Sequence, residues 1–213
     1  KDMRETIHEE GKKMAELVGG NVPLLSTTVK PEGTLSLLPT VSSGVHYSHS
    51  PYYIRRVRIN ATDPLLKVCE ELGYPVHPEV GQTEENCTTK VIEFPVQAPE
   101  GKTKFDTNAI EQLETYKMFQ EYYTDHNTSI TVTVRDDEWE DVEQWMWDNW
   151  DYVLGISFLS LSDSFYQLMP FEACSKEEYE KRKAEMKPFQ PSLLRKYEIQ
   201  MNEDADVEDP ECA

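Results

Sequence analysis

The residues whose types and spacing suggest chemistry form one short loop. The run Lys30-Pro31-Glu32-Gly33-Thr34-Leu35-Ser36 combines a lysine, a glycine and two hydroxyl side chains after a β-branched segment. In such a turn, successive backbone N–H groups can point the same way and bind an anion. Gly33 would let a ligand approach the backbone because glycine has no Cβ. The sequence therefore predicts a phosphate-binding loop made of Pro31, Glu32, Gly33, Thr34, Leu35 and Ser36.

The other members of this run fit the same hypothesis to different degrees. Lys30 supplies a full positive charge, and a helix beginning at Leu35 would add a partial one at its N-terminus. Glu32 has to point outward or contribute only its backbone, because a carboxylate repels a phosphate. The run is not a Walker loop, since no Gly-Lys-Ser/Thr follows at the required distance. A plain strand–turn–strand with a threonine cap is the alternative that spacing leaves open.

A second polar loop follows and ends in arginines. Aromatic rings beside a phosphate site are suited to a base or cofactor pocket, but tyrosines also commonly pack half-buried without any ligand. The arginines have two interpretations as well. They can bind an anion, or they can have a structural role, as the outward charges of a strand or as partners of carboxylates in so acidic a chain. No cluster of ligating side chains surrounds the two histidines, so no metal site is predicted. The residues concerned are Ser42 to His46, Tyr47, His49, Tyr52, Tyr53, Arg55, Arg56 and Arg58.

Composition limits the partners of the chain. Its 213 residues carry a net charge of −19, which would repel duplex DNA and anionic lipid at long range. No apolar run approaches the ~20 residues that a membrane helix needs. The first residues are charged and polar, unlike a secretory signal peptide. We therefore expect a cytoplasmic protein that binds neither nucleic acid nor membrane.

Hydrophobic periodicity predicts the elements that must position these loops. Apolar residues recur at helical spacing in five segments, and β-branched or alternating residues indicate four strands. Asp63 is an N-cap with Pro64 at the first helical position, and Ser175 with Glu178 forms a capping box. Such alternation favours an α/β architecture with a largely parallel sheet. The expected helices are 3–18, 63–73, 107–123, 136–150 and 175–186, and the expected strands are 26–29, 91–96, 129–134 and 156–161.

The C-terminal end differs in composition from the rest. Residues 201–213 contain six acidic residues and no basic one, which is typical of a disordered segment. We therefore divide the chain into a folded part, 1–200, and an acidic tail, 201–213. Cys212 lies in that tail, whereas Cys69 falls on the apolar face of an expected helix and is predicted to be buried and inert. The spacing of the four cysteines matches no zinc or CxxC pattern.

Taken together, the two loops resemble one family. Val29–Leu38, Ser43–His46 and Tyr52–Arg58 are similar to the C-terminal half of adenosylcobalamin-dependent (class II) ribonucleotide reductases. The segments 127–134, 156–159, 170–172 and 177–179 resemble later parts of the same half. Glu32 stands where that family usually has serine, which leaves the part of this residue in phosphate binding open. The combination of Lys-Pro-x-Gly-Thr with Ile-Arg-Arg-Val-Arg is the most specific feature of the resemblance.

The resemblance implies a fold, an activity and partners. The fold would be the C-terminal part of a ten-stranded α/β barrel, and Pro31 to Ser36 would bind the phosphates of a ribonucleoside di- or triphosphate. The complete enzyme would use adenosylcobalamin to generate a thiyl radical and reduce ribonucleotides to deoxyribonucleotides. Cys212 would be the first cysteine of a distal redox pair that takes electrons from a thioredoxin-type reductant. The N-terminal portion of the reductase would be the protein partner.

Two departures refine this interpretation. Iron-dependent (class I) relatives carry two adjacent tyrosines on a late strand, where this chain has Ser157 and Phe158. The family motif Asn-Pro-Cys-x-Glu, which contains the radical cysteine, is absent from the sequence. The chain is therefore expected to be inactive alone, as a portion of a reductase. The alternative is a non-catalytic module that binds a phosphorylated ligand or a protein.

Overall fold

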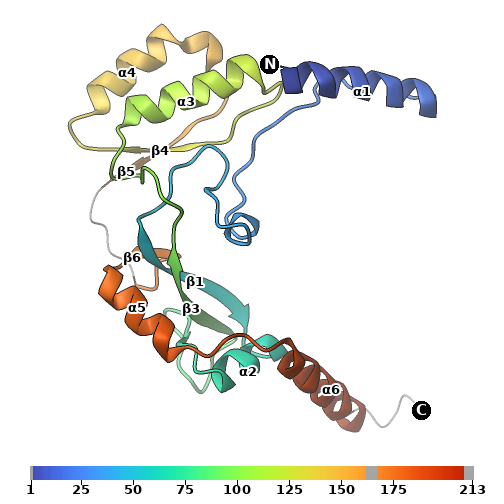
Figure 1. Ribbon diagram of the computed structural model, residues 1–213, viewed down its shortest axis with the longest axis vertical. Helices are drawn as coiled ribbons and strands as arrows, with labels where there is room; N and C mark the ends of the chain where they lie inside the picture. Colours follow the sequence, from blue (N-terminus) through green and yellow to red (C-terminus); the bar gives the residue numbers. More distant parts are fainter. Residues whose placement is uncertain (1, 162–166, 209–213) are drawn as a thin grey trace. The chain divides into compact units, whose positions relative to one another are not determined.

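The chain folds into helices and strands that form two compact units. The computed structural model describes residues 2–161 and 167–208, and side chains as far as residue 200 (Figure 1). The first unit comprises Lys1–Ser50 with Ala98–Ser164, and the second comprises Pro51–Gln97 with Phe165–Ala213. The elements in chain order are α1 (Asp2–Val18), the 3₁₀ helix η1 (Leu35–Leu37), β1 (Tyr52–Asn60), α2 (Pro64–Glu71), β2 (Val76–Pro78), β3 (Thr89–Gln97), α3 (Ala109–Tyr122), β4 (Thr131–Val134), α4 (Trp139–Asp148), η2 (Trp150–Tyr152), β5 (Ser157–Ser160), β6 (Phe171–Ala173), α5 (Lys176–Glu185) and α6 (Pro191–Glu208).

The first unit is built on a parallel pair of strands covered by two helices. β4 pairs with β5 in parallel, and Val132 faces Phe158 in the register. Helices α3 and α4 lie together on one side of this pair (Figure 1). Alternate β4 side chains point toward the helices, so Val132 and Val134 are fully buried. They pack against a core that also contains Val45, Ala109, Leu113, Tyr116, Ile130, Val142 and Trp145.

The predicted strand at 26–29 is reduced to one β-bridge. Val29 pairs in parallel with Thr128, just before β4. Asp125 fixes this segment by accepting a 2.9 Å hydrogen bond from the Ser26 amide. The same carboxylate binds Arg4 and His8 of α1, with its side chain only 4% exposed. Burial raises the pKa of Asp125, but the hydrogen bonds from Ser26, His8 and Arg4 outweigh burial and hold the pKa well below its usual value.

Helix α1 forms as predicted, but its apolar stripe is not a buried face. Met3 is 70% exposed, Met14 58% and Leu17 80%, while Ala15 is the buried residue of the helix. A stripe of this kind is normally covered by another element. The described part of the chain therefore leaves an apolar helix face without a cover.

The second unit is an antiparallel sheet, which corrects one expectation. Its strand order is β2-β3-β1-β6, and each neighbouring pair is antiparallel. The prediction of a largely parallel sheet is therefore wrong for this unit and holds for β4 with β5. The predicted order of elements did not include β1 or β6, although a strand was one interpretation of the arginines that β1 contains. Leu66 and Cys69 of α2 pack against Ile92 of β3 and form the core.

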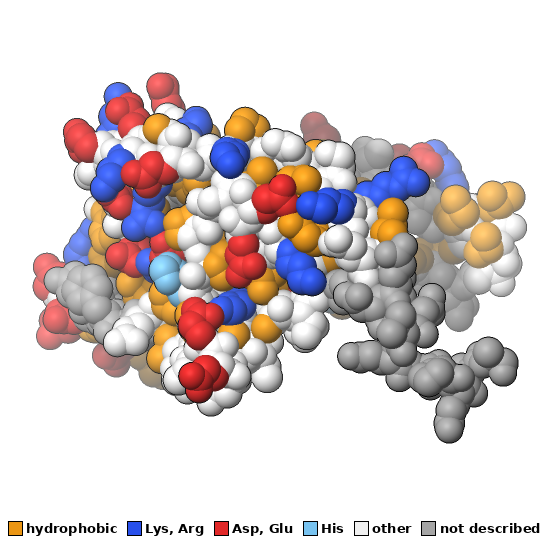
Figure 2. Space-filling model, turned by 90° about the horizontal axis from the view of Figure 1, so that it is seen from below, with side chains coloured by type: hydrophobic (Ala, Val, Ile, Leu, Met, Phe, Trp, Pro, Cys, Tyr) orange, Lys and Arg blue, Asp and Glu red, His pale blue; other side chains and the backbone are white. Residues whose placement is uncertain are grey.

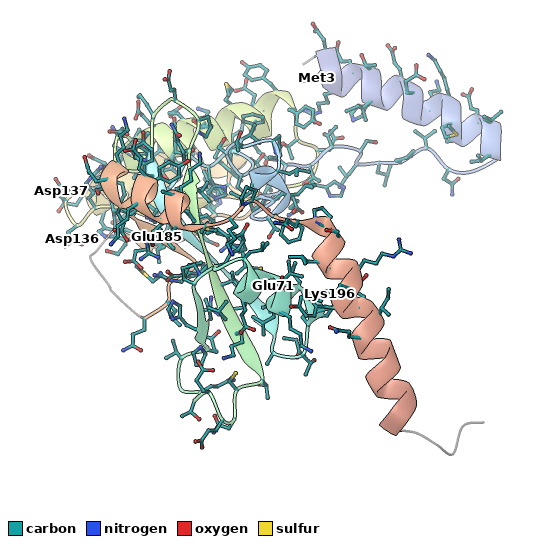
Figure 3. The ribbon with its side chains drawn as sticks, turned by 60° about the horizontal axis from the view of Figure 1, so that its bottom comes forward. Met3, Glu71, Asp136, Asp137, Glu185 and Lys196 are labelled. Carbon is teal, nitrogen blue, oxygen red and sulfur yellow. The ribbon has the colours of Figure 1, made fainter. Side chains whose placement is uncertain are left out.

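Helices α5 and α6 complete the second unit. Ser175 caps α5 through a 3.1 Å hydrogen bond from the Glu178 amide, as the capping box predicts. Helix α6 runs beside α2, where Lys196 lies 3.5 Å from the carboxylate of Glu71 (Figure 3). The backbone of α6 continues through residue 201 to Glu208. The boundary between a folded part and a tail at residue 201 thus stays a prediction.

No helix among the described residues is both long and apolar enough to cross a membrane. On the face drawn in Figure 2, Lys and Arg side chains lie among Asp and Glu side chains instead of gathering into one basic patch.

Candidate functional site: the Pro31–Ser36 loop

The Pro31–Ser36 loop projects from the first unit directly after the bridge at Val29. Pro31, Glu32, Gly33, Thr34 and Leu35 are exposed, and Ser36 is half-buried. The predicted helix after Thr34 is a single 3₁₀ turn, Leu35–Leu37, with no side-chain hydrogen bond from Thr34 as a cap. One turn adds little dipole, so the loop has to bind an anion mainly through individual N–H groups.

The backbone amides of the loop divide into two groups. Ser36 N donates to Glu32 O at 3.3 Å, and Leu37 N donates to Thr34 O at 3.1 Å. Within residues 2–161 and 167–208, the amides of Gly33, Thr34 and Leu35 donate to no protein group. Three consecutive N–H groups without partners form the kind of donor set that binds oxyanions. These amides are available to an anion, and the phosphate-binding role of the loop stays a prediction.

Gly33 and Gly44 are glycines for different reasons. A Cβ built on Gly33 would meet no atom within 4 Å, and the backbone there is not in the left-handed region. Gly44 has φ +58°, and its Cβ would lie 3.2 Å from Pro31 Cα and 3.3 Å from Lys30 O. Gly44 is thus required by the fold, because it packs against the beginning of the loop. The fold places no such demand on Gly33, which leaves the space above it free for a ligand.

The two charged residues at the start of the loop are positioned differently from each other. Lys30 Nζ donates to Ser129 Oγ at 2.7 Å, so its side chain runs toward the residues that precede β4. The side chain of Glu32 makes no ion pair in the part of the chain that the structure describes, and it is exposed. This exposure matches the expectation that Glu32 points outward.

The second loop holds the first one in place. His46 Nδ1 lies 2.9 Å from Ser43 O, and the Thr131 amide donates to His46 Nε2 at 2.9 Å. These contacts need a neutral ring with its proton on Nδ1. His46 therefore links the loop that contains Gly44 to the start of β4. The sequence did not reveal this role, although a histidine two residues after a glycine in a Ser-Ser-Gly turn was a visible signal.

A cavity of about 460 Å³ lies beside the second loop. Its walls come from residues 40–48, from the segment 99–102 and from two side chains of α3, Thr115 and Phe119. His46 and Tyr47 line this cavity and His49 does not, and the binding of a base or cofactor there stays a prediction. Burial first, and Lys104 second, lower the pKa of His49 to about 4. Among the described residues, no group of His, Cys, Asp or Glu could hold a metal ion.

Tyr52 and Tyr53 belong to β1 of the second unit and pack against protein. The Tyr52 ring lies 5.1 Å from Tyr179, and the Tyr53 ring lies 5.5 Å from Phe171. The packing alternative considered for these tyrosines therefore describes them well, because both rings already have aromatic neighbours.

Protein groups bind all three arginines of β1, although the buried Nε of Arg55 has no hydrogen-bond partner among the described residues. Arg56 donates to Glu93 at 2.7 Å and to Glu172 at 2.5 Å, with its side chain only 8% exposed. Arg182 of α5 binds the other oxygen of Glu93 at 2.5 Å. Burial raises the pKa of Glu93, but the hydrogen bonds from Arg56 and Arg182 outweigh burial and hold the pKa below its usual value. This buried network has no free donor set for a phosphate.

The two arginines on either side of Arg56 are also engaged. Arg55 lies over the Phe171 ring at 4.5 Å and donates to Pro170 O at 3.1 Å. Arg58 pairs with Glu79 and donates to Leu168 O at 3.1 Å. Of the two interpretations of the arginines, pairing inside the protein is the one that the geometry favours.

Two of the described cysteines, Cys69 and Cys174, are not activated nucleophiles. Cys69 is buried, and burial raises the pKa of its thiol to about 11. Burial also raises the pKa of Cys174. Because the thiolate is the reactive form, both thiols are poorly suited to redox exchange. Cys212, the predicted distal redox cysteine, lies outside the described residues, and its role stays a prediction.

Comparisons with known proteins confirm the resemblance. The chain is 32% identical over 178 residues to an adenosylcobalamin-dependent ribonucleoside-triphosphate reductase of Lactobacillus acidophilus, covering 81% of this chain and 23% of that protein. The reductase of Euglena gracilis is 34% identical over 180 residues, covering 83% of this chain and 24% of that protein. A probable reductase of the same kind from Dictyostelium discoideum is 32% identical over 213 residues, covering 97% of this chain and 27% of that protein.

A solved structure supports the same relationship. The crystal structure of a B₁₂-dependent (class II) ribonucleotide reductase matches with a TM-score of 0.78 and 28% sequence identity, over 95% of this chain and 28% of that one. No family model matches the chain. The chain thus spans about a quarter of the length of the curated relatives it matches, and it is similar in sequence and fold to that part of them.

Proposed function

We propose that this relative of the adenosylcobalamin-dependent ribonucleotide reductases is the C-terminal portion of such an enzyme, and that its Pro31–Ser36 loop binds the substrate phosphates. The observation that supports the loop most strongly is the set of unpaired amides at Gly33, Thr34 and Leu35, beside a glycine that the fold does not require. The curated relatives are named ribonucleoside-triphosphate reductases, so a ribonucleoside triphosphate is the substrate we favour.

In this proposal, the chain contributes binding and positioning. The amides of residues 33–35 would donate to phosphate oxygens, and charge-assisted bonds of that kind are stronger than neutral ones. Gly44 and His46 would hold the loop in place through Pro31 and Thr131. Precise positioning matters because a ribose misplaced by about 1 Å reacts far more slowly. We propose that the radical cysteine comes from the rest of the enzyme, since this sequence lacks Asn-Pro-Cys-x-Glu, and that the chain alone is inactive.

Adenosylcobalamin is proposed as the cofactor of the complete enzyme, where it would generate the thiyl radical. The corrin ring already holds its cobalt, so a protein cluster of metal ligands is not required. In the described residues we find no donor set or cradle that we assign to the cobalamin. We therefore derive no step through the cofactor from this chain.

Two further partners belong to the proposal. The rest of the reductase would cover apolar surface that this chain leaves exposed, such as Leu17 of α1 and Leu24 after it, which are 80% and 95% exposed. It would also complete a ten-stranded barrel around β4 and β5. Cys212 would receive electrons from a thioredoxin-type reductant, and the cytoplasm is the compartment that suits this chemistry.

Calorimetric titration of the chain with a ribonucleoside triphosphate tests the loop directly. We expect Gly33→Val to lower the affinity at least tenfold and to leave the free energy of unfolding nearly unchanged, because a Cβ at this position meets no protein atom within 4 Å. Gly11→Val in α1 is a control, since a Cβ there also meets no atom within 4 Å. Equal affinity of the Gly33→Val and wild-type chains for the triphosphate would show that the loop is not part of the binding site.

The competing function is a non-catalytic module that binds a phosphorylated ligand or a protein. Mixing the chain with a separately produced N-terminal portion of a related reductase, adenosylcobalamin and a dithiol distinguishes the two. Formation of deoxyribonucleotide that depends on both portions supports the reductase. Nucleotide binding without any turnover in the mixture would favour the module.

A further inference from the structure

The outer face of α4 exposes two large aromatic side chains. Trp147 is 69% exposed and Trp150, in the adjoining η2 turn, is 62% exposed. Their rings are stacked, with centroids 6.0 Å apart and an interplanar angle of 26°. Trp145 points the other way, into the core, because two residues along a helix correspond to about 200° of rotation. An exposed, pre-stacked tryptophan pair is unusual on a surface that faces only water.

The segment that carries this pair is rich in carboxylates. Residues 136–151 contain eight Asp and Glu residues and no Lys or Arg. Glu138 pairs with Arg135 at 3.0 Å. The other seven have no ion-pair partner among the residues that the structure describes. Asp136 and Asp137, which precede the helix, are exposed and lie at the surface in Figure 3. We call the tryptophan pair together with these carboxylates the α4 surface.

The position of the α4 surface indicates that no further helix or strand of the same fold is needed to cover it. Val142 and Trp145 already bury the inner side of α4 against the core of the first unit. In a layered α/β fold, the outer side of such a helix faces solvent. Additional strands would instead join β5, where Leu159 is 60% exposed and the strand has one described neighbour, β4.

We propose that the α4 surface binds a basic, amphipathic segment of another protein. Arginine side chains of the partner would stack on Trp147 and Trp150 and pair with the flanking carboxylates, while its apolar side chains would cover the remaining ring surface. A second copy of this chain is a poor occupant, because a symmetric contact would bring two sets of unpaired carboxylates together. This inference is independent of phosphate binding by the Pro31–Ser36 loop.

The test is a titration of the full 213-residue chain with designed peptides, followed by calorimetry. The probe is a helical peptide of leucine and arginine with the leucines on one face. One control peptide has serine in place of each leucine, and so keeps the charge without the apolar face. We expect the leucine–arginine peptide to bind at least tenfold more tightly than the serine–arginine peptide, with weaker binding at high salt.

Variants locate the site of binding. The double variant Trp147→Ser/Trp150→Ser should lower the affinity for the leucine–arginine peptide at least tenfold. The matched double variant Leu17→Ser/Leu24→Ser removes two apolar side chains elsewhere in the unit that are even more exposed, and should change the affinity less than twofold. Equal binding of the two peptides, or equal losses in the two double variants, would overturn the proposal. A chain that is dimeric and becomes monomeric on tryptophan replacement would also overturn it, in favour of a second copy as the occupant.

Discussion

The Pro31–Ser36 loop and the arginines of β1 were both candidate anion sites, and the structure separates them. Arg56 has the higher charge, yet Glu93 and Glu172 already neutralise it. The amides of Gly33, Thr34 and Leu35 have only partial charges, yet they have no protein partner in the described part of the chain. A binding site therefore depends on donors that the fold leaves unused, and the number of basic residues in a sequence does not reveal which donors those are.

The largest effect should come from breaking the arginine network. We expect Arg56→Met to lower the free energy of unfolding by up to about 3–5 kcal/mol, because it removes one of the two arginines that pair with buried Glu93 and leaves only Arg182. Arg58→Met is the control, since Arg58 and Glu79 form a pair at the surface whose loss costs about 0–1 kcal/mol. Urea denaturation measures both values. Similar losses in the two variants would show that the network is not the stabilising element we describe.

A smaller loss of stability should follow from replacing the structural glycine of the second loop. Gly44→Ala forces a side chain into a left-handed backbone and against Pro31, at a cost of about 1–2 kcal/mol. Gly33→Ala should be nearly neutral in the same denaturation experiment. If Gly33→Ala were the more damaging of the two, the division between a structural and a functional glycine would be wrong.

Lowering the pH should destabilise the network of Arg56 and Glu93 before it affects the Pro31–Ser36 loop. In the folded state the pKa of Glu93 lies below its usual value of 4.5. The ionised carboxylate therefore stabilises the fold fully at a pH above 4.5, and this contribution is lost as the pH falls through the lowered pKa. Amide hydrogen exchange of β1 and β3, followed as the pH is lowered from neutral, should show this loss. In Glu93→Gln the pH dependence should largely disappear. An unchanged dependence would assign it to other carboxyl groups.

The smallest effect concerns the loop hydroxyl. Thr34 is exposed and makes no capping hydrogen bond, so its hydroxyl can donate to a bound phosphate. Thr34→Ala should therefore weaken triphosphate binding by about two- to tenfold, which is the contribution of one hydrogen bond. The titration should show no effect on binding from Thr62→Ala, a change in the second unit. A full loss of binding in Thr34→Ala would mean that the hydroxyl matters more than the amides.

The sequence predicted elements whose signals are local. Asp63 with Pro64, Ser175 with Glu178, and the alternation in 129–134 each depend on neighbouring residues, and each corresponds to an element of the structure. Strand β1 was not in the predicted order of elements, because a strand was only one of several interpretations of Arg55, Arg56 and Arg58. Their partners, Glu93 and Glu172, are distant in sequence, so local patterns could not show that the charges are paired.

The same limit applies to the candidate site. The glycine, hydroxyl and lysine of the Pro31–Ser36 loop were recognisable by type. The contact of Gly44 with Pro31 and the bond between His46 and the Thr131 amide join segments that are far apart in the chain. Contacts of this kind arise from the tertiary fold, and a single sequence gives no direct signal for them. The apolar stripe of α1 likewise predicted a helix but could not tell what covers it.

Backbone amide NMR during titration with a ribonucleoside triphosphate tests the central claim most directly. The account predicts that the largest shifts occur at the amides of Gly33, Thr34 and Leu35, and that Gly33→Val abolishes them. Largest shifts at the amides of Arg55, Arg56 and Arg58, with the loop unaffected, would contradict it.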